Sequence, residues 1–176
     1  MSEASAIDLS GEITERLNTQ RPGKIAVMSY VDSKGQPHVS VRASVIVYGR
    51  DQLALWVRDS YVGTMTVGAQ IGAASSTPSS TPLQSGLLAG IEQNPLVAVL
   101  FREGTTTYVF SGRAHVEADD AAREAIFSQL PDGERNHSTV TGARTGTAVV
   151  IDLDSVIGGS LGEGGVIASH VEMSRS

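Results

Sequence analysis

An arginine and a serine two positions apart are the residues of this chain best suited to chemistry. Arg42 and Ser44 lie in an alternating run from Pro37 to Tyr48, which follows a turn at residues 32–35. Successive side chains of a strand point to opposite faces, so both polar groups are expected on one face. A guanidinium beside a hydroxyl on a rigid surface suits an anionic group such as a phosphate. The sequence therefore predicts an anion site on this strand.

The other face of the same run is apolar. Its residues are Val39, Val41, Ala43, Val45 and Val47. We expect this face to fill the interior of a β-barrel, because apolar residues at a spacing of two mark the buried side of a strand. A second cation, Arg58, ends the next alternating run and supplies another positive charge for the anion site.

Six strands are predicted to position these residues. They cover residues 24–31, 37–48, 53–58, 96–101, 105–117 and 147–153. The run 96–101 is apolar throughout, which is typical of a strand buried on both faces. Three helices are expected at the periphery: one capped by Asp8 or Ser10, one over residues 83–93 and one opened by residues 119–120. Hairpin links and few helices favour an antiparallel barrel over a parallel α/β sheet.

Composition narrows the class of protein. The 176 residues suffice for one ordinary domain, and 19 acidic against 13 basic side chains argue against nucleic acid and anionic membranes as partners. The chain has no cysteine, which excludes thiol chemistry and fits a reducing compartment. There is no signal peptide and no apolar segment of about 18 residues, so a cytoplasmic protein is expected.

The chain divides into three parts by composition. Residues 1–23 form an N-terminal helix and lead-in, residues 24–158 the barrel domain, and residues 159–176 a Gly-rich C-terminal tail. The barrel is interrupted at 61–84 by an insertion rich in Ser, Thr and Pro. Such a segment is either a floppy loop or a lid over a substrate, and the sequence leaves both interpretations open.

The order of these motifs resembles the pyridoxamine 5'-phosphate oxidase-like FMN-binding split barrel. The matching stretches are residues 24–47, 53–60, 86–88 with 94–101, and 110–116. The resemblance implies a mainly β fold with peripheral helices, namely a six-stranded antiparallel split β-barrel. It also implies a homodimer with FMN held between the two barrels.

The resemblance assigns site residues by position. Arg42 matches the family's phosphate-binding arginine, and the next three residues, Ala43, Ser44 and Val45, match the segment that lines the flavin. Trp56 and Val57 match residues around the ribityl chain and the phosphate. Thr107 matches a polar residue that contacts the flavin ring. The family's cation after the third strand is missing, because no charge occurs between Asp59 and Glu92. The phosphate set is therefore expected to be Arg42 and Arg58, helped by Ser44, Ser60, Ser85 and a helix N-terminus at Ser85–Gly86.

These features predict an FMN-dependent oxidoreductase that acts on a small, cyclic organic substrate, with a reduced nicotinamide as one electron donor. Residues 164–173 lack the arginine with which true pyridoxamine-phosphate oxidases bind their substrate, so that activity is not expected. The alternatives are a deazaflavin-dependent reductase, a non-enzymatic flavin- or haem-binding module, or an empty barrel that serves as a scaffold. No catalytic side chain is singled out, and the four histidines show no metal-ligand spacing.

Overall fold

One antiparallel sheet organises the chain. The computed structural model describes residues 6–58, 85–140 and 143–175. In chain order, the elements are α1 (Glu12–Asn18), β1 (Ile25–Val31), β2 (Pro37–Val41), β3 (Ile46–Gly49), β4 (Gln52–Val57), α2 (Ser85–Gln93), β5 (Leu96–Glu103), β6 (Thr106–Val116), α3 (Asp120–Gln129), α4 (Asp132–His137), β7 (Thr139–Val140), β8 (Ala143–Arg144), β9 (Thr147–Leu161), a 3₁₀ turn (Glu163–Gly165) and β10 (Ile167–Ser174).

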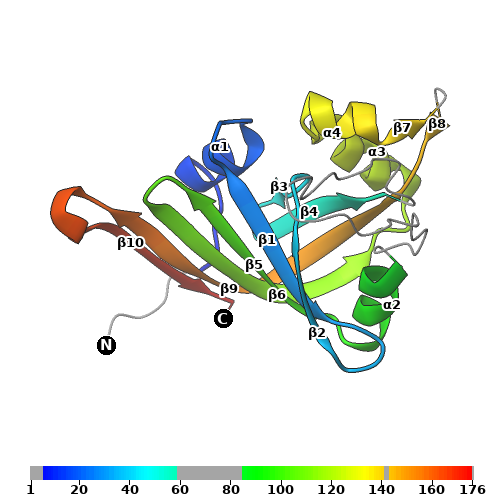
Figure 1. Cartoon of the computed structure of the whole chain (residues 1–176), viewed down its shortest axis with the longest axis horizontal. Coiled ribbons are helices and arrows are strands. Elements are labelled where there is room, and N and C mark those ends of the chain that lie inside the picture. Colours follow the sequence, from blue (N-terminus) through cyan, green and yellow to red (C-terminus); the bar gives the residue numbers. More distant parts are fainter. Residues whose placement is uncertain (1–5, 59–84, 141–142, 176) are drawn as a thin grey trace, which may run out of the picture.

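The main sheet has eight strands in the order β2-β1-β5-β6-β9-β4-β3, with β10 added on β9. It curves around a core but is not closed, because β2 and β3 stand at its two ends (Figure 1). The expected fold class, a mainly antiparallel β protein with peripheral helices, is confirmed. All six predicted strand regions are present, although two of them differ from expectation in detail.

The predicted strand from Pro37 to Tyr48 is wrong as a single element. It forms two strands, β2 and β3, separated by a turn at Ala43 and Ser44. β2 pairs with β1, whereas β3 pairs with β4 at the other end of the sheet. The break cannot be predicted from the sequence, because the alternating pattern continues through it and no glycine or proline marks the turn.

The break also corrects the predicted burial. Val39 and Val41 are 72% and 70% exposed, whereas Val45 and Val47 are buried in the core. After the turn, the same alternating positions point to the interior instead of to the solvent. A single alternating pattern in the sequence therefore does not correspond to a single face of the sheet. The strand β5 differs in the same way, since Leu96 and Leu100 are exposed rather than buried on both sides.

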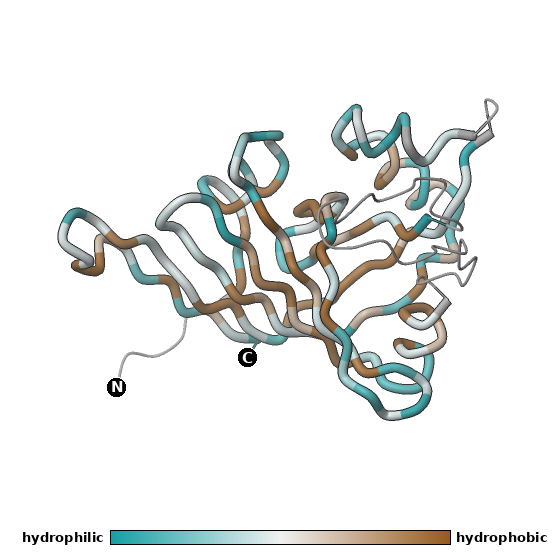
Figure 2. Tube along the Cα trace, viewed as in Figure 1, coloured by the Kyte–Doolittle hydropathy of each residue, from teal (hydrophilic) through white to brown (hydrophobic). Residues whose placement is uncertain are grey.

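The interior of the barrel is one apolar cluster. It includes Leu9 and Leu17 from the N-terminal segment, Met28 of β1, and the rings of Phe101, Tyr108 and Phe110. Figure 2 shows these hydrophobic stretches along the strands, with hydrophilic residues at the turns and at the ends of the helices. A second cluster covers the opposite face of β3, β4 and β9, where Trp56 and Val150 pack against Ile126 and Leu130 at α3.

The helix α2 packs closely on β1 because two glycines face the strand. A β-carbon placed on Gly90 would lie 2.6 Å from the carbonyl oxygen of Val31, and one on Gly86 would lie 3.5 Å from the hydroxyl of Tyr30. The four-residue spacing of these glycines puts both on one side of the helix. The N-terminal turn of α2 is thereby positioned beside the β1–β2 hairpin.

Two further expectations concern the ends of the chain. Neither Asp8 nor Ser10 caps α1, which begins after Gly11 at a φ of 77° without a side-chain cap, whereas Asp119 caps α3 by accepting from the N–H of Ala122. Residues 159–176 were expected to be a tail, but β9 continues to Leu161 and pairs there with β10, forming a hairpin that projects from the barrel (Figure 1). Among the described residues, no helix is long and apolar enough to cross a membrane.

Candidate functional site

Arg42 follows β2 and is the predicted site residue with the most unusual environment. Its backbone N–H donates to the carbonyl of Ala26 at 2.8 Å, which fixes its position at the end of the strand. Its Nε atom is buried and has no hydrogen-bond partner among the described residues. Burial lowers the pKa of Arg42, although a guanidinium remains charged at neutral pH. The side chain is therefore a partly desolvated cation without a counter-ion in the described chain.

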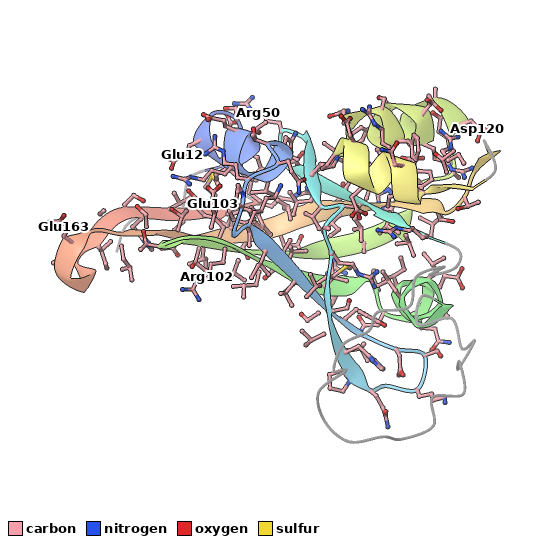
Figure 3. All side chains as sticks on the ribbon, turned by 45° about the horizontal axis from the view of Figure 1, so that its top comes forward. Glu12, Arg50, Arg102, Glu103, Asp120 and Glu163 are labelled. Atoms are coloured by element: carbon pink, nitrogen blue, oxygen red, sulfur yellow. The ribbon has the colours of Figure 1, made fainter. Side chains whose placement is uncertain are left out.

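The other arginines differ from Arg42 in this respect. Apart from Arg102, each of them forms an ion pair with an aspartate or glutamate. Arg102 donates from Nε to the carbonyl of Gly104 at 3.3 Å and projects from the side of the sheet opposite α1 (Figure 3). Since Arg102 is exposed, water can satisfy its remaining N–H groups, whereas the buried Nε of Arg42 has no such access.

Arg58 and Ser44, the other two central residues of the predicted phosphate set, are already engaged. Arg58 donates from Nη2 to Oε2 of Glu134 in α4 at 2.8 Å, with side chains that are 20% and 15% exposed. The hydroxyl of Ser44 donates to the carbonyl of Trp56 at 3.0 Å and accepts from the N–H of the same residue at 3.2 Å. The Ser44 side chain thereby satisfies the backbone groups of β4 at Trp56, where β3 no longer pairs with that strand.

Three of the predicted cofactor residues are packed inside the protein. Val45 and Val57 belong to the barrel core. Trp56 is buried in the second cluster, where its indole N–H donates to the carbonyl of Thr145 at 2.8 Å and its ring meets Phe127 edge-on, with centroids 5.0 Å apart. In the single chain these side chains shape the barrel and present no surface to a ligand.

The remaining predicted residues lie at or near the surface. Ala43 is exposed at the turn after β2, Gly86 lies in the first turn of α2, and Thr107 is half-buried on β6. Ser60 lies outside the described residues, and of Ser85 only the backbone, at the start of α2, is described. Thus the structure brings Arg42 and Gly86 to the same side of the sheet, through Tyr30, while Arg58 and Trp56 belong to a separate region under α3 and α4.

A bare apolar band crosses five strands on the outer face of the sheet. The strand registers align Val41, Val27, Leu100, Val109 and Ile157 across β2, β1, β5, β6 and β9. All of them except Val27 are counted among the exposed large hydrophobic residues. Beside this band runs a line of small side chains, Ser29, Ala98, Ser111 and Ser155. Sequence reasoning missed this surface because the same alternation was interpreted as a barrel interior.

Thr107 lies on the other side of the apolar band. It aligns with Arg102 on β5 and with Gly159 on β9, so a hydroxyl, a guanidinium and a bare backbone lie side by side. The three residues form the polar border of the band. A flat ligand on the band would meet apolar side chains along its middle and hydrogen-bonding groups at this border.

The sequence matches no protein-family model and no curated protein. Solved structures, however, share the fold. A pyridoxamine 5'-phosphate oxidase-related, FMN-binding protein from Nostoc punctiforme aligns over 100% of both chains with a TM-score of 0.55 and 12% identity. HupZ from Group A Streptococcus aligns over 90% of this chain and 97% of its own, with a TM-score of 0.53 and 16% identity.

General Stress Protein 26 from Bacillus anthracis is a third example, with a TM-score of 0.53, 15% identity, and coverage of 84% of this chain and 94% of its own. The chain thus has the fold of the pyridoxamine 5'-phosphate oxidase-like split barrels, as the order of its motifs indicates. At these identities the comparison establishes the fold and leaves the chemistry to the residues of the site.

Proposed function

We propose that this chain binds FMN between two copies of itself and is a flavin-dependent oxidoreductase for a small, cyclic organic substrate. The observation that carries the proposal is Arg42, a partly desolvated guanidinium that no carboxylate of the described residues neutralises. A phosphate group would supply the missing charge and accept from the buried Nε. The fold supports the same ligand, since one of its structural neighbours is described as FMN-binding.

The bare outer face is the surface proposed for the flavin ring and for the second copy. Its apolar band ends on β2 at Val41, directly before Arg42 and the exposed Ala43. Small side chains beside the band would let a flat ring lie close to the backbone, and Thr107 would contact the polar edge of the ring. A second chain packed on the band would shield the ring from water.

When bound, the flavin supplies the capacity to accept and donate a hydride. The chain would bind and orient it: Arg42 holds the phosphate, Ala43 and Thr107 border the ring, and the band excludes water. Ser44 and Arg58 would first have to release the Trp56 backbone and Glu134, so Arg42 has the larger share of the phosphate site. A reduced nicotinamide as electron donor and a cytoplasmic location are parts of the same proposal.

Titration of the purified protein with FMN, followed by the shift of the flavin absorbance, tests the cofactor. We expect saturable binding of FMN, weaker binding of riboflavin, and oxidation of a reduced nicotinamide by the loaded protein. A chain that binds neither flavin would contradict the proposal. Binding of a deazaflavin or of haem in its place would favour the corresponding alternative.

The second copy is tested separately by sedimentation. Val109→Glu places a charge in the middle of the apolar band and should convert a dimer into a monomer. Val166→Glu is the control, because Val166 is also an exposed valine but lies at the tip of the β9–β10 hairpin, away from the band. A wild-type monomer, or a V109E variant that remains dimeric, would remove the band from the interface.

A further inference from the structure

A second buried polar atom without a partner lies next to Arg42. The hydroxyl of Ser40 is buried and makes no hydrogen bond among the described residues. Ser40 lies on β2 two positions before Arg42, which directly follows the strand, so both side chains point to the same face. Buried hydroxyls nearly always have a partner, and two unsatisfied groups on one strand face indicate a missing ligand.

Tyr30 brings a third donor to the same face. It aligns with His38, and the register also pairs Met28 with Ser40, so Tyr30 lies diagonally across from Ser40. The residue is 7% exposed, and its hydroxyl has no hydrogen-bond partner among the described residues. Its ring stacks on that of His38, with centroids 5.3 Å apart and an interplanar angle of 16°. The ring thus stacks on His38 and also lies close to α2 at Gly90.

The hydroxyl of Tyr30 is directed at the first turn of α2. It lies 3.5 Å from the position of a β-carbon on Gly86, the second residue of this nine-residue helix. The first backbone N–H groups of a helix have no partner within the helix and carry a partial positive charge. Burial raises the pKa of Tyr30, so its hydroxyl stays protonated at neutral pH and can donate.

The carboxylate of the β1–β2 hairpin is already hydrogen-bonded. Asp32 accepts from the backbone N–H groups of Lys34 and Gln36 through Oδ1, and its Oδ2 lies 2.9 Å from Nε2 of His38. These bonds lower the pKa of Asp32 and hold it in the turn of the β1–β2 hairpin. Asp32 therefore orders the hairpin and is not positioned as a counter-ion for Arg42, with which it forms no ion pair.

We propose that Ser40, Tyr30, Arg42 and the first turn of α2 form one cradle for a phosphate monoester dianion. The inference rests on the proposed function in so far as the phosphate is that of FMN. It changes the expected composition of the phosphate site, because Ser40 and Tyr30 take the roles that the sequence assigned to Ser44 and Arg58. Two hydroxyls, a guanidinium and helix N–H groups together give donors on several sides of a tetrahedral anion.

The test uses Ser40→Ala and Tyr30→Phe, which each remove one oxygen and keep the packing. Ser138→Ala is the matched control, since the Ser138 hydroxyl is also buried and has no partner among the described residues but lies at the end of α4. Thermal unfolding without ligand should show that none of the three variants is less stable than the wild type, because each removes a hydroxyl that makes no hydrogen bond to another described residue.

Binding should then separate the variants. S40A and Y30F are expected to weaken FMN by about tenfold to a hundredfold each, as the loss of a hydrogen bond to a charged group does, and to leave riboflavin unchanged. S138A should bind both flavins like the wild type. Inorganic phosphate should raise the melting temperature of the wild type and of S138A, and should have less effect on S40A and Y30F.

The outcomes distinguish this inference from the proposed function. If FMN binds and S40A and Y30F bind it as the wild type does, the cradle is wrong and the flavin proposal stands. If FMN does not bind but phosphate stabilises the protein through Ser40 and Tyr30, the cradle stands and the flavin proposal falls. If neither FMN nor phosphate has an effect on the wild type, both are wrong.

Discussion

Arg42 and Arg58 occupy comparable positions in the chain but differ in their ion-pair partners. Each follows a strand, each was assigned to the same phosphate from the sequence, and each is partly buried. Arg58 meets Glu134, which lies 76 residues further along the chain, at 2.8 Å. Arg42 meets no carboxylate among the described residues, and its Nε is unsatisfied. The difference shows that the missing partner, and not the position on a strand, identifies a candidate binding residue.

The two regions around these arginines differ in the same way. Around Arg58, the second apolar cluster and the ion pair to α4 leave little for a ligand to add. Around Arg42, by contrast, the outer face of β2 is bare and the inner face carries unsatisfied donors. A region that is complete in the single chain serves stability, whereas a region left incomplete gains most from a ligand or a second chain.

The sharpest test of this contrast is Arg42→Ala. We expect it to weaken FMN by about 2–4 kcal/mol, because it removes a charge-assisted and partly desolvated contact. It should not lower the free energy of unfolding of the unliganded protein, since no ion pair is lost. Flavin titration and denaturant unfolding measure the two quantities.

Lys34→Ala is the control for Arg42→Ala. It removes one positive charge from the same β1–β2 hairpin but from an exposed position in the turn. If K34A weakens FMN as much as R42A does, the effect is that of overall charge and Arg42 is not a contact. If R42A alone destabilises the unliganded protein, its side chain has a structural role comparable to that of Arg58.

The sequence predicted the sheet well because alternation and turn residues are local signals. It failed at Ala43 and Ser44, where the chain crosses from one end of the sheet to the other and no glycine or proline marks the turn. It also assigned Val39 and Val41 to the interior, because an apolar face left bare has the same pattern as a buried one.

The candidate site was predictable only in part. Arg42 was found from its neighbours, and Ser40 lies on the same polar face, so the sequence contained that signal as well. Arg58 could not be judged, because Glu134 approaches it only through folding of α4. Tyr30 could not be found either, since its role depends on how closely two glycines bring α2 to β1.

Arg58→Ala should show the opposite profile to Arg42→Ala. Removing the guanidinium leaves Glu134 partly buried without its partner, so we expect a loss of about 2 kcal/mol in the free energy of unfolding. FMN binding should change little. The double variant R58A/E134A is the control: it should recover part of the loss, because no unpaired carboxylate remains, and an additive result would mean that the pair contributes nothing.

Ser44→Ala extends the comparison from the two arginines to the two serines on either side of the turn. Its hydroxyl holds both backbone groups of Trp56, so its loss should cost about 1 kcal/mol of stability and leave FMN binding unchanged. Ser40→Ala, on the other side of the turn, should cost no stability and should weaken FMN. If both serines instead weaken FMN equally, the phosphate reaches the turn at Ala43 and the original assignment of Ser44 holds.

The smallest effect is expected at an arginine that is paired but fully exposed. Arg50 donates to Oδ2 of Asp8 from Nε at 3.0 Å and from Nη2 at 2.7 Å, and these bonds lower the pKa of Asp8 well below its ordinary value of 3.8. Because the folded chain then binds fewer protons than the unfolded chain, the pair stabilises the fold above pH 3.8 and this contribution is lost as the pH falls below that value.

Arg50→Ala should therefore lower the melting temperature slightly near pH 7 and leave it unchanged at the acid end, which makes the acid limb of the melting temperature against pH flatter. The loss at pH 7 should be small in salt, because an exposed pair is screened. A loss at pH 7 as large as that of R58A would mean that pairing stabilises this fold regardless of burial. An unpaired Arg42 would then signify less, because the contrast between Arg42 and Arg58 depends on burial making an unsatisfied charge costly.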